Sequence, residues 1–349
     1  MEYLDVAFTL CGEKGLPLLA AAVRSTWESC AQPERLRIHL LWWDIGEDSL
    51  TRLVSGWEDY LSHFHLYSAG SHLPELASQS RYGFWYRIWL GRVLGPEVER
   101  LLYLDCDVLV RGDISELWAL DMRDALAAVV WDPAQRVEGF RQPLVENGHR
   151  FGFPFRWEDP YFNSGVLFLN LKKWREERIG DTIHRVFFGK TEWSRFNDQD
   201  PLNLVLNGRT KPLSPSWNLI ETVPYYRKWD YQLYRDFGPP DEYFEPKIRH
   251  FAGSQKPETL WARWSHKVEF YGYLQRCGWL DETPLERSPW WRRLLSQLVE
   301  LHYLVCRGLL QRALNKPLPR LCRLLLPRPH LFFCYFLFLA YLWFRGEPE

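Results

Sequence analysis

Two aspartates separated by one residue, Asp105 and Asp107, follow an apolar stretch that is typical of a buried strand. In an extended chain, residues i and i+2 point the same way, so both carboxylates are expected to face one small volume at the end of that strand. Adjacent carboxylates repel unless one is protonated or a cation lies between them, and hard oxygen donors suit Mg²⁺ or Mn²⁺. A plain cap and turn after a strand would give the same pattern.

The same triplet is compatible with a second chemistry. An apolar strand followed by Asp-x-Asp-Val-Leu resembles the nucleophile motif of haloacid-dehalogenase-like phosphatases, in which the first aspartate, here Asp105, attacks phosphorus. Those domains need a later metal motif of the Gly-Asp-Asp type. The nearest candidate, residues 180–182, reads Gly-Asp-Thr within a helical pattern, so this alternative has weaker support.

Three later segments place further polar groups at the ends of predicted elements. YFNSGV, from residue 161, opens a strand, and NDQDPLN, from residue 197, puts carboxylates and amides at the positive end of a helix. There they either cap the helix or reach a ligand. IRHFAGSQKP, from residue 248, ends a strand in a histidine, a glycine turn and a lysine.

In order and spacing, LLYLDCDVLV, YFNSGVLFLNLKKWR, NDQDPLNLVL with the following SPSWN, and HFAGSQKP resemble glycosyltransferase family 8. The likeness is strongest to the bacterial lipopolysaccharide or lipooligosaccharide α-galactosyl- and α-glucosyltransferases. The resemblance implies a GT-A fold, a UDP-sugar donor, Mn²⁺ or Mg²⁺ as cofactor, and retention at the anomeric carbon. It also implies a saccharide acceptor such as the lipopolysaccharide core and, in many members, a basic C-terminal membrane attachment.

The resemblance assigns roles residue by residue. Asp105, Asp107 and His250 would hold the metal, while Lys256 and Gly253 would contact the donor diphosphate. These types fit the chemistry, because a divalent cation and a lysine stabilise the negative charge that develops on a departing UDP.

Further residues match donor-binding positions of the family. They are Arg87, Cys106, Asp132, Asn163, Ser164, Asp198 and Gln199. Hydrogen bonds from such groups to sugar hydroxyls would discriminate galactose from glucose. Asp198 and Gln199 are the catalytic candidates beside the reacting carbon. An amide is a poor nucleophile and no flanking pair of carboxylates is evident, so double displacement and same-face internal return both stay open.

The nucleoside contacts depart from the family pattern. After the first strand, where relatives carry acidic and aromatic residues, this chain reads TLCGEK from residue 9. The backbone of Phe8, Thr9 and Leu10 can still meet the edge of the base. This departure is the one feature that favours a different class, a non-catalytic carbohydrate-binding protein at a membrane surface, and the intact metal and donor residues count against it.

Alternating strand and helix patterns supply the frame for these residues. Strands are expected at residues 3–10, 36–43, 63–67, 100–104, 126–130, 165–170 and 247–251, and helices at 16–27, 47–60, 80–94, 172–189, 198–207 and 258–277. The alternation predicts an α/β fold with a Rossmann-like, doubly wound and mostly parallel sheet. Residues 132–160, rich in Pro, Gly and aromatics, are expected to form a functional loop region.

Charge divides the 349 residues unevenly. Residues 290–349 hold nine basic and three acidic residues, whereas residues 1–289 hold 34 basic and 41 acidic residues. We therefore expect a catalytic domain over residues 1–285 and a basic, amphipathic helical tail over residues 286–349 that meets an anionic membrane surface. The fourteen uncharged residues 331–344 are fewer than the roughly 20 that a spanning helix needs.

Composition also bounds the location and the partners. Seven scattered cysteines without C-x-x-C spacing argue against a disulfide framework or a zinc knuckle and favour a reducing compartment. The first strand lacks the basic leader of a signal peptide, and the acidic body disfavours nucleic acid. The expected protein is cytoplasmic, lies peripherally on the inner membrane, and works on a UDP-hexose and a glycolipid or oligosaccharide acceptor.

Overall fold

The structure is a computed structural model. It describes residues 2–55, 57–74, 83–132, 135, 139–188, 193–220, 246–253, 256–257, 264–280, 293–294, 296–297 and 300. The strands are β1 (Leu4–Cys11), β2 (Leu36–Trp43), β3 (Phe64–Ser68), β4 (Arg100–Leu104), β5 (Val108–Val110), β6 (Ala127–Trp131), β7 (Phe162–Asn170), β8 (Thr210–Pro212), β9 (Leu219–Ile220) and β10 (Ile248–His250).

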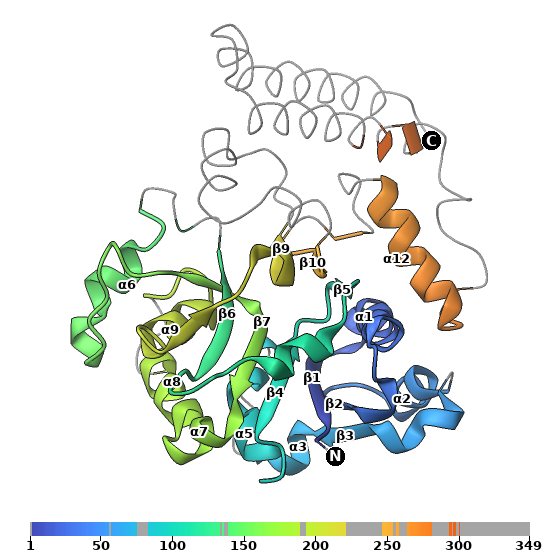
Figure 1. Ribbon diagram of the computed structural model, residues 1–349, viewed down its shortest axis with the longest axis horizontal. Helices are drawn as coiled ribbons and strands as arrows, with labels where there is room; N and C mark the ends of the chain where they lie inside the picture. The colour runs from blue at the N-terminus through green and yellow to red at the C-terminus, as the bar shows by residue number, and fades with distance from the viewer. Residues whose placement is uncertain are drawn as a thin grey trace, which may run out of the picture.

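Helices alternate with the strands (Figure 1). The α-helices are α1 (Leu16–Ser29), α2 (Glu47–Val54), α3 (Ala69–His72), α5 (Leu90–Val93), α6 (Gln142–Asn147), α7 (Leu171–Glu176), α8 (Ile179–Phe188), α9 (Gln199–Val205) and α12 (Trp264–Arg276). The 3₁₀ helices are η1 (Glu13–Gly15), η2 (Pro33–Arg35), η3 (Glu58–His63), η4 (Gly83–Trp89), η5 (Ile114–Ala119), η7 (His149–Phe151) and η8 (Pro215–Asn218).

The main sheet has the strand order β3-β2-β1-β4-β7-β6-β8. Only β7 runs against the other strands of this sheet, since it pairs antiparallel with both β4 and β6. This confirms the predicted doubly wound, mostly parallel α/β sheet. The strand order reverses between β1 and β4, and ligands of open α/β sheets bind at the carboxyl ends of strands at such a point. A small sheet, β5-β10-β9, lies beyond these ends (Figure 1).

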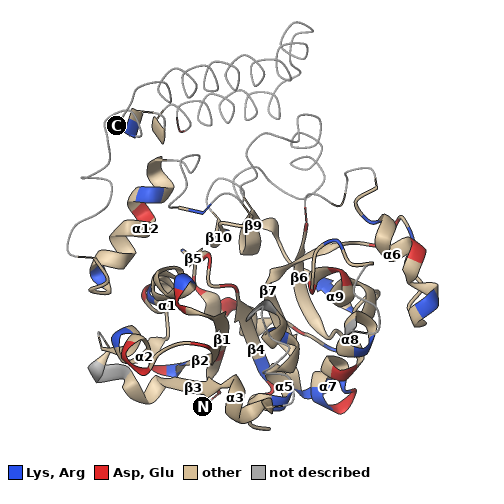
Figure 2. Cartoon of the chain, turned by 180° about the vertical axis from the view of Figure 1, so that it is seen from behind, with Lys and Arg blue, Asp and Glu red and all other residues tan. Residues whose placement is uncertain are grey.

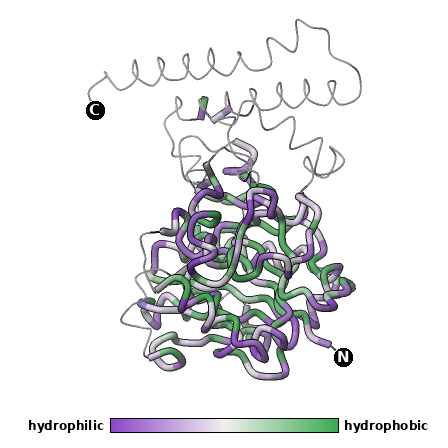
Figure 3. Tube along the Cα trace, turned by 90° about the vertical axis from the view of Figure 1, so that its left-hand side faces the viewer, coloured by the Kyte–Doolittle hydropathy of each residue, from purple (hydrophilic) through white to green (hydrophobic). Residues whose placement is uncertain are grey.

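Helices cover both faces of the sheet, which explains why its central strands read as continuous apolar runs. Along β1, the alternate residues Leu4, Val6 and Phe8 pack with α1, α2 and α12, whereas Ala7 packs with the opposite layer of η4, α5, α7, α8 and α9. Figure 3 shows the resulting hydrophobic interior.

Several predicted elements differ from those observed. The helix expected at 172–189 is split into α7 and α8 at Arg178, whose φ of 52° lies outside the helical region. The helix at 47–60 ends at Val54, the one at 80–94 is mainly the 3₁₀ helix η4, and the expected loop at 132–160 contains α6. Strands β5, β8 and β9, of two or three residues, were not predicted because such short runs carry no periodicity.

The beginning of the predicted tail contacts α12. Lys267 of this helix donates to Ser296 Oγ at 2.9 Å, and the Ser265 hydroxyl donates to Glu300 at 2.7 Å. Residues 301–349, with the apolar run 331–344, lie outside the described residues, so the amphipathic tail and its boundary at 285 stay predictions. Within the described part of the chain, none of the helices combines the length and apolar character that crossing a bilayer demands.

Charged residues of both signs are interspersed along outer helices such as α7 and α12 (Figure 2). Asp5 of β1 is an exception because its side chain is buried. It accepts hydrogen bonds from its register partner Arg37, at 2.6 and 2.8 Å, and from His39 at 2.8 Å. Burial alone would raise the pKa of Asp5, but His39 and Arg37 outweigh it and lower the pKa. This ion cluster ties β1 to β2.

Replacing Asp5 by Asn should therefore destabilise the protein by about 3 kcal/mol in urea unfolding, because Arg37 is left without its counter-ion. The folded state lowers the pKa of Asp5 from its ordinary 3.8, so the stabilisation is present above that value and is lost as the pH falls through the lowered pKa. The matched control is Asp181→Asn, which breaks the exposed pair with Arg178 and should cost less than about 1 kcal/mol. Equal losses in the two variants would contradict the expectation.

Candidate active site

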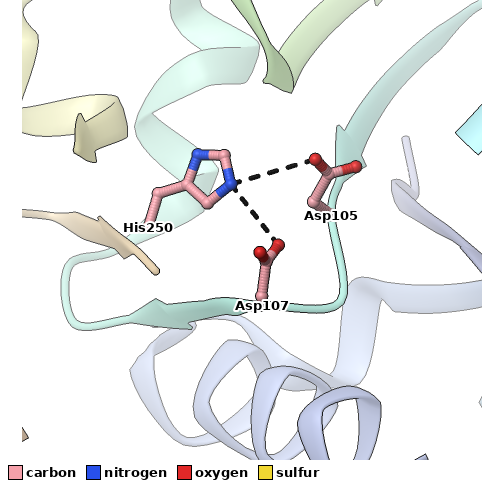
Figure 4. A group of neighbouring side chains, drawn as sticks. All are labelled: Asp105, Asp107 and His250. Carbon is pink, nitrogen blue, oxygen red and sulfur yellow. Dashed lines mark ion pairs between the residues drawn. The ribbon is translucent and has the colours of Figure 1, made fainter. Parts of the chain in front are cut away.

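Asp105, Asp107 and His250 converge from separate elements (Figure 4). Asp105 directly follows β4, Asp107 precedes β5, and His250 ends β10, where it pairs with Val108. The Nε2 atom of His250 lies 3.8 Å from Asp105 Oδ2 and 3.4 Å from Asp107 Oδ1. One ligand atom from each residue falls within 4.8 Å of the others, so these three side chains could hold one metal ion.

The two aspartates come together for a different reason from the one the sequence suggested. Cys106 and Asp107 lie in a turn, so the expectation of an extended chain through this triplet was wrong. The Cys106 thiol donates to the carbonyl of Thr9 at 3.3 Å, and burial raises its pKa to about 12. The thiol therefore stays protonated and anchors the turn to the end of β1.

Arg87, on η4, joins two parts of the site. Its guanidinium is buried and lies 2.9 Å from Asp105 Oδ1 and 3.0 Å from Asp198 Oδ2. The same group donates to the carbonyl of Ser164 at 2.5 Å and stacks 4.5 Å above the Tyr103 ring. One cation thus bridges Asp105, at the end of β4, and Asp198, at the start of α9.

The two carboxylates that share Arg87 have opposite pKa shifts. Burial would raise the pKa of Asp105, but Arg87, His250, the Tyr103 hydroxyl and Lys256 together outweigh burial and lower it. For Asp198, burial dominates over Arg87, and the charge of Asp105 adds to it, so the pKa rises to about 7. At neutral pH Asp105 is ionised. Asp198, whose pKa is about 7, is divided between its protonated and ionised forms.

Gln199, the first residue of α9, lies in a network of buried polar groups. Its Oε1 accepts from the Ser164 backbone N–H at 3.1 Å and from Asn163 Nδ2 at 3.0 Å. Its Nε2 donates to Asp132 at 3.2 Å and to the Tyr161 hydroxyl at 3.1 Å. The structure therefore brings the residues expected around the sugar into direct contact with one another.

The remaining predicted residues lie outside the hydrogen bonds of this network. Phe8 and Leu10 have side chains in the core and pair with Leu40 and Trp42 of β2, while Thr9 Oγ1 lies 3.2 Å from the Tyr103 hydroxyl. Lys256 pairs with Asp107. Gly253 has a φ of 65°, a conformation that favours glycine.

Sequence reasoning missed three residues that shape the site. Tyr103 donates to Asp105 Oδ1 at 2.6 Å. The sequence could have indicated this contact, because Tyr103 of β4 lies two residues before Asp105 and residues i and i+2 of a strand point to the same face. Asn218 Oδ1 lies 2.9 Å from His250 Nδ1, and a Cβ on Gly165 would fall 2.2 Å from His250 Cε1. Asn218 and Gly165 belong to the motifs quoted above. Their roles depend on contacts with His250, a residue distant in the sequence, which the sequence does not display.

Known proteins match most of this chain. The model of glycosyl transferase family 8 matches residues 21–265, a range that contains every predicted site residue except 8–10. Lipopolysaccharide 1,2-glucosyltransferase of Escherichia coli K12 is 31% identical over 230 residues, which are 63% of this chain and 63% of that protein. General stress protein A of Bacillus subtilis 168 is 27% identical over 198 residues, 56% of this chain and 65% of that protein. The chain thus spans less than two thirds of the length of these relatives.

Solved structures share the fold. The galactosyltransferase LgtC in complex with donor and acceptor sugar analogs gives a TM-score of 0.61 at 22% identity, covering 84% of this chain and 100% of that one. The bifunctional glycosyltransferase WbbM gives 0.64 at 19% identity, covering 84% and 52%. These matches confirm the expected GT-A fold. Asp181, the second motif of the phosphatase alternative, lies in α8 and pairs with Arg178, so that alternative gains no support.

Gly165→Ala should disturb the three convergent side chains, because the new Cβ would lie 2.2 Å from His250 Cε1 and 2.9 Å from Asp105 Oδ2. We expect Mn²⁺ affinity, measured by calorimetry without any substrate, to fall by at least about tenfold. Gly272→Ala in α12 is the control, since its Cβ would meet nothing closer than 3.5 Å and should stabilise the helix by up to about 1 kcal/mol. Unchanged Mn²⁺ binding in the Gly165 variant would show that His250 is not seated against β7.

Proposed function

The chain belongs to glycosyl transferase family 8, and we propose that it transfers galactose or glucose from a UDP-sugar to a saccharide acceptor, with a divalent metal ion and with retention. The observation that carries the proposal is the convergence of Asp105, Asp107 and His250, with Lys256 directly beside them. The lipopolysaccharide 1,2-glucosyltransferase among the relatives supports a lipopolysaccharide acceptor, and we propose its core.

The donor set fits Mn²⁺ or Mg²⁺. Carboxylate oxygens suit both ions, and an imidazole nitrogen is compatible with Mn²⁺. Burial lowers the pKa of His250, which keeps the ring neutral and able to act as a ligand. Bound by Asp105, Asp107 and His250, the ion would stabilise the negative charge that develops on the departing UDP.

Other residues of the site have separate roles in binding the donor and in the reaction. Arg87 holds Asp105 ionised, and the Lys256 ammonium, now paired with Asp107, lies where it can also pair with a diphosphate. Gln199 Oε1 already accepts two hydrogen bonds, which reduce its nucleophilicity. We therefore favour same-face internal return over attack by Gln199, with Asp198 as the group that can hold a proton near neutral pH.

We further propose that the basic tail holds the enzyme at the cytoplasmic surface of the inner membrane. Residues 301–349 carry seven basic and two acidic residues, beside the apolar run 331–344. Each basic residue near an anionic surface contributes about 1 kcal/mol to binding. Attachment there would bring the catalytic domain close to a glycolipid acceptor.

Asp107→Asn should lower metal-dependent turnover by about 10³-fold, because it removes one charged metal ligand and with it several kcal/mol of charge stabilisation. The measurement is the release of UDP from UDP-galactose or UDP-glucose with Mn²⁺, before and after chelation. Asp124→Asn is the matched control, since its carboxylate is exposed and pairs only with Lys173 among the contacts described. Full turnover in the Asp107 variant would refute the metal assignment.

Calorimetry separates the enzyme from a carbohydrate-binding protein of the same fold. The proposed enzyme should bind a UDP-sugar only when Mn²⁺ is present. Binding of the saccharide acceptor without any affinity for UDP-sugars, together with no UDP release, would favour the non-catalytic class instead.

A chain that ends after Glu300 should no longer sediment with anionic vesicles, whereas the full chain should. This truncation keeps the contacts of Ser296 and Glu300 with α12, so the catalytic domain retains its described packing. Neutral vesicles and high salt provide the controls, because the attraction of basic residues is screened by salt. Continued sedimentation of the truncated chain would show that the tail is not the attachment site.

A further inference from the structure

The polar network of the site begins at an irregularity in β7. Between the register pairs Val129–Leu167 and Trp131–Phe162, β6 advances by two residues while β7 advances by five. Residues 163–165 therefore leave the ladder with β6, and the N–H groups of Ser164 and Gly165 bind side chains instead. The Gly165 N–H donates to Asn163 Oδ1 at 2.9 Å, and the Ser164 N–H donates to Gln199 Oε1 at 3.1 Å.

These backbone donors fix the orientation of two side-chain amides. A backbone N–H can only donate, so the atom of Asn163 facing Gly165 is the oxygen. The Asn218 group 2.9 Å from that oxygen is consequently the NH₂, and the oxygen of Asn218 faces His250 Nδ1 at 2.9 Å. Nδ1 of the neutral ring must then carry the proton.

The opposite nitrogen of His250 is left with its lone pair toward the aspartates. Its distances to them, 3.4 and 3.8 Å, exceed those of an N–H···O hydrogen bond, whereas the 2.9 Å contact at Nδ1 is in range. Carboxylates nonetheless attract a ring N–H, and a proton on Nε2 would block metal binding. An acceptor at Nδ1 is therefore needed to hold the other tautomer.

We propose that Asn218 and Asn163 are positioning residues that hold His250 in the Nδ1–H tautomer and so keep Nε2 available to a metal ion. The proposal rests on the metal-dependent function proposed above. Both asparagines are buried, so water does not compete for their hydrogen bonds. Asn163 also donates to Gln199 at 3.0 Å, which links the ligand geometry at the metal end to the amide expected at the sugar end.

The test compares two substitutions of Asn218. Asn218→Leu removes the acceptor for Nδ1–H, whereas Asn218→Asp keeps an acceptor there, loses the donor to Asn163 and adds a negative charge that also favours a proton on Nδ1. We expect ¹⁵N NMR of histidine-labelled, metal-free protein to show a protonated Nδ1 in the wild type and in Asn218→Asp, and a proton shifted to Nε2 in Asn218→Leu. A His250→Gln variant assigns the resonance. Mn²⁺ affinity should fall about 10- to 100-fold in Asn218→Leu and be restored in Asn218→Asp.

Two further variants separate positioning from a general loss of structure. Asn163→Asp keeps the acceptor for the Gly165 N–H and for Asn218 but loses the donor to Gln199, so its tautomer and Mn²⁺ affinity should stay as in the wild type while turnover falls. Asn207→Leu removes an asparagine that contacts Asp159 instead, and it should change neither readout.

The outcomes distinguish this proposal from the proposed function. A proton on Nε2 in the wild type, or an unchanged tautomer and Mn²⁺ affinity in Asn218→Leu, would overturn the positioning role. A wild type that has the Nδ1–H tautomer but binds no Mn²⁺ would instead overturn the metal-dependent function, because the ring nitrogens are observed without metal.

Discussion

The site depends on the need to satisfy the backbone groups of residues 163–165 after β7 leaves the ladder with β6. Buried N–H and C=O groups are costly when unpaired, and here the residues of the site pair with them. The Ser164 carbonyl accepts from Arg87, the Ser164 N–H donates to Gln199, and the Gly165 N–H donates to Asn163, while the Gly165 carbonyl stays paired with the Asp105 N–H on the β4 side. The register irregularity between β6 and β7 thus fixes the positions of the site residues.

The different pKa values of Asp105 and Asp198 arise because both carboxylates pair with the same cation. Arg87 is shared by Asp105 and Asp198, and one cation cannot favour the ionised form of two buried carboxylates equally. Asp105 also receives the Tyr103 hydroxyl and lies near Lys256, so it ionises first and leaves Asp198 with a pKa of about 7. The carboxylate suited to a metal ion and the one suited to hold a proton are therefore distinguished by their neighbours.

The sequence predicted what local pattern encodes. Strands β1, β2 and β4 were placed within a residue because both faces are buried, and the motifs named the residues that converge on Asp105. Contacts between distant segments could not be predicted. Asn218 is 55 positions from Asn163, and Gly165 matters only because His250 packs against it, so neither role has a local signature. The turn at Cys106 is local, but the pattern of the triplet fitted a turn and an extended chain equally, so the sequence alone did not decide between them.

The strand that carries His250 is also linked to the part of the chain that leads to the tail. Arg249, its neighbour on β10, pairs with Glu269 of α12, and Glu269 pairs in turn with Arg111 at 2.9 Å. The same helix contacts Ser296 through Lys267. Because close-packed interiors transmit displacements, α12 couples the described residues Ser296 and Glu300 to the strand that carries His250. Strand β10, which carries His250, is therefore held by its pairing with β5 and β9 and by the ion pair of Arg249 with α12.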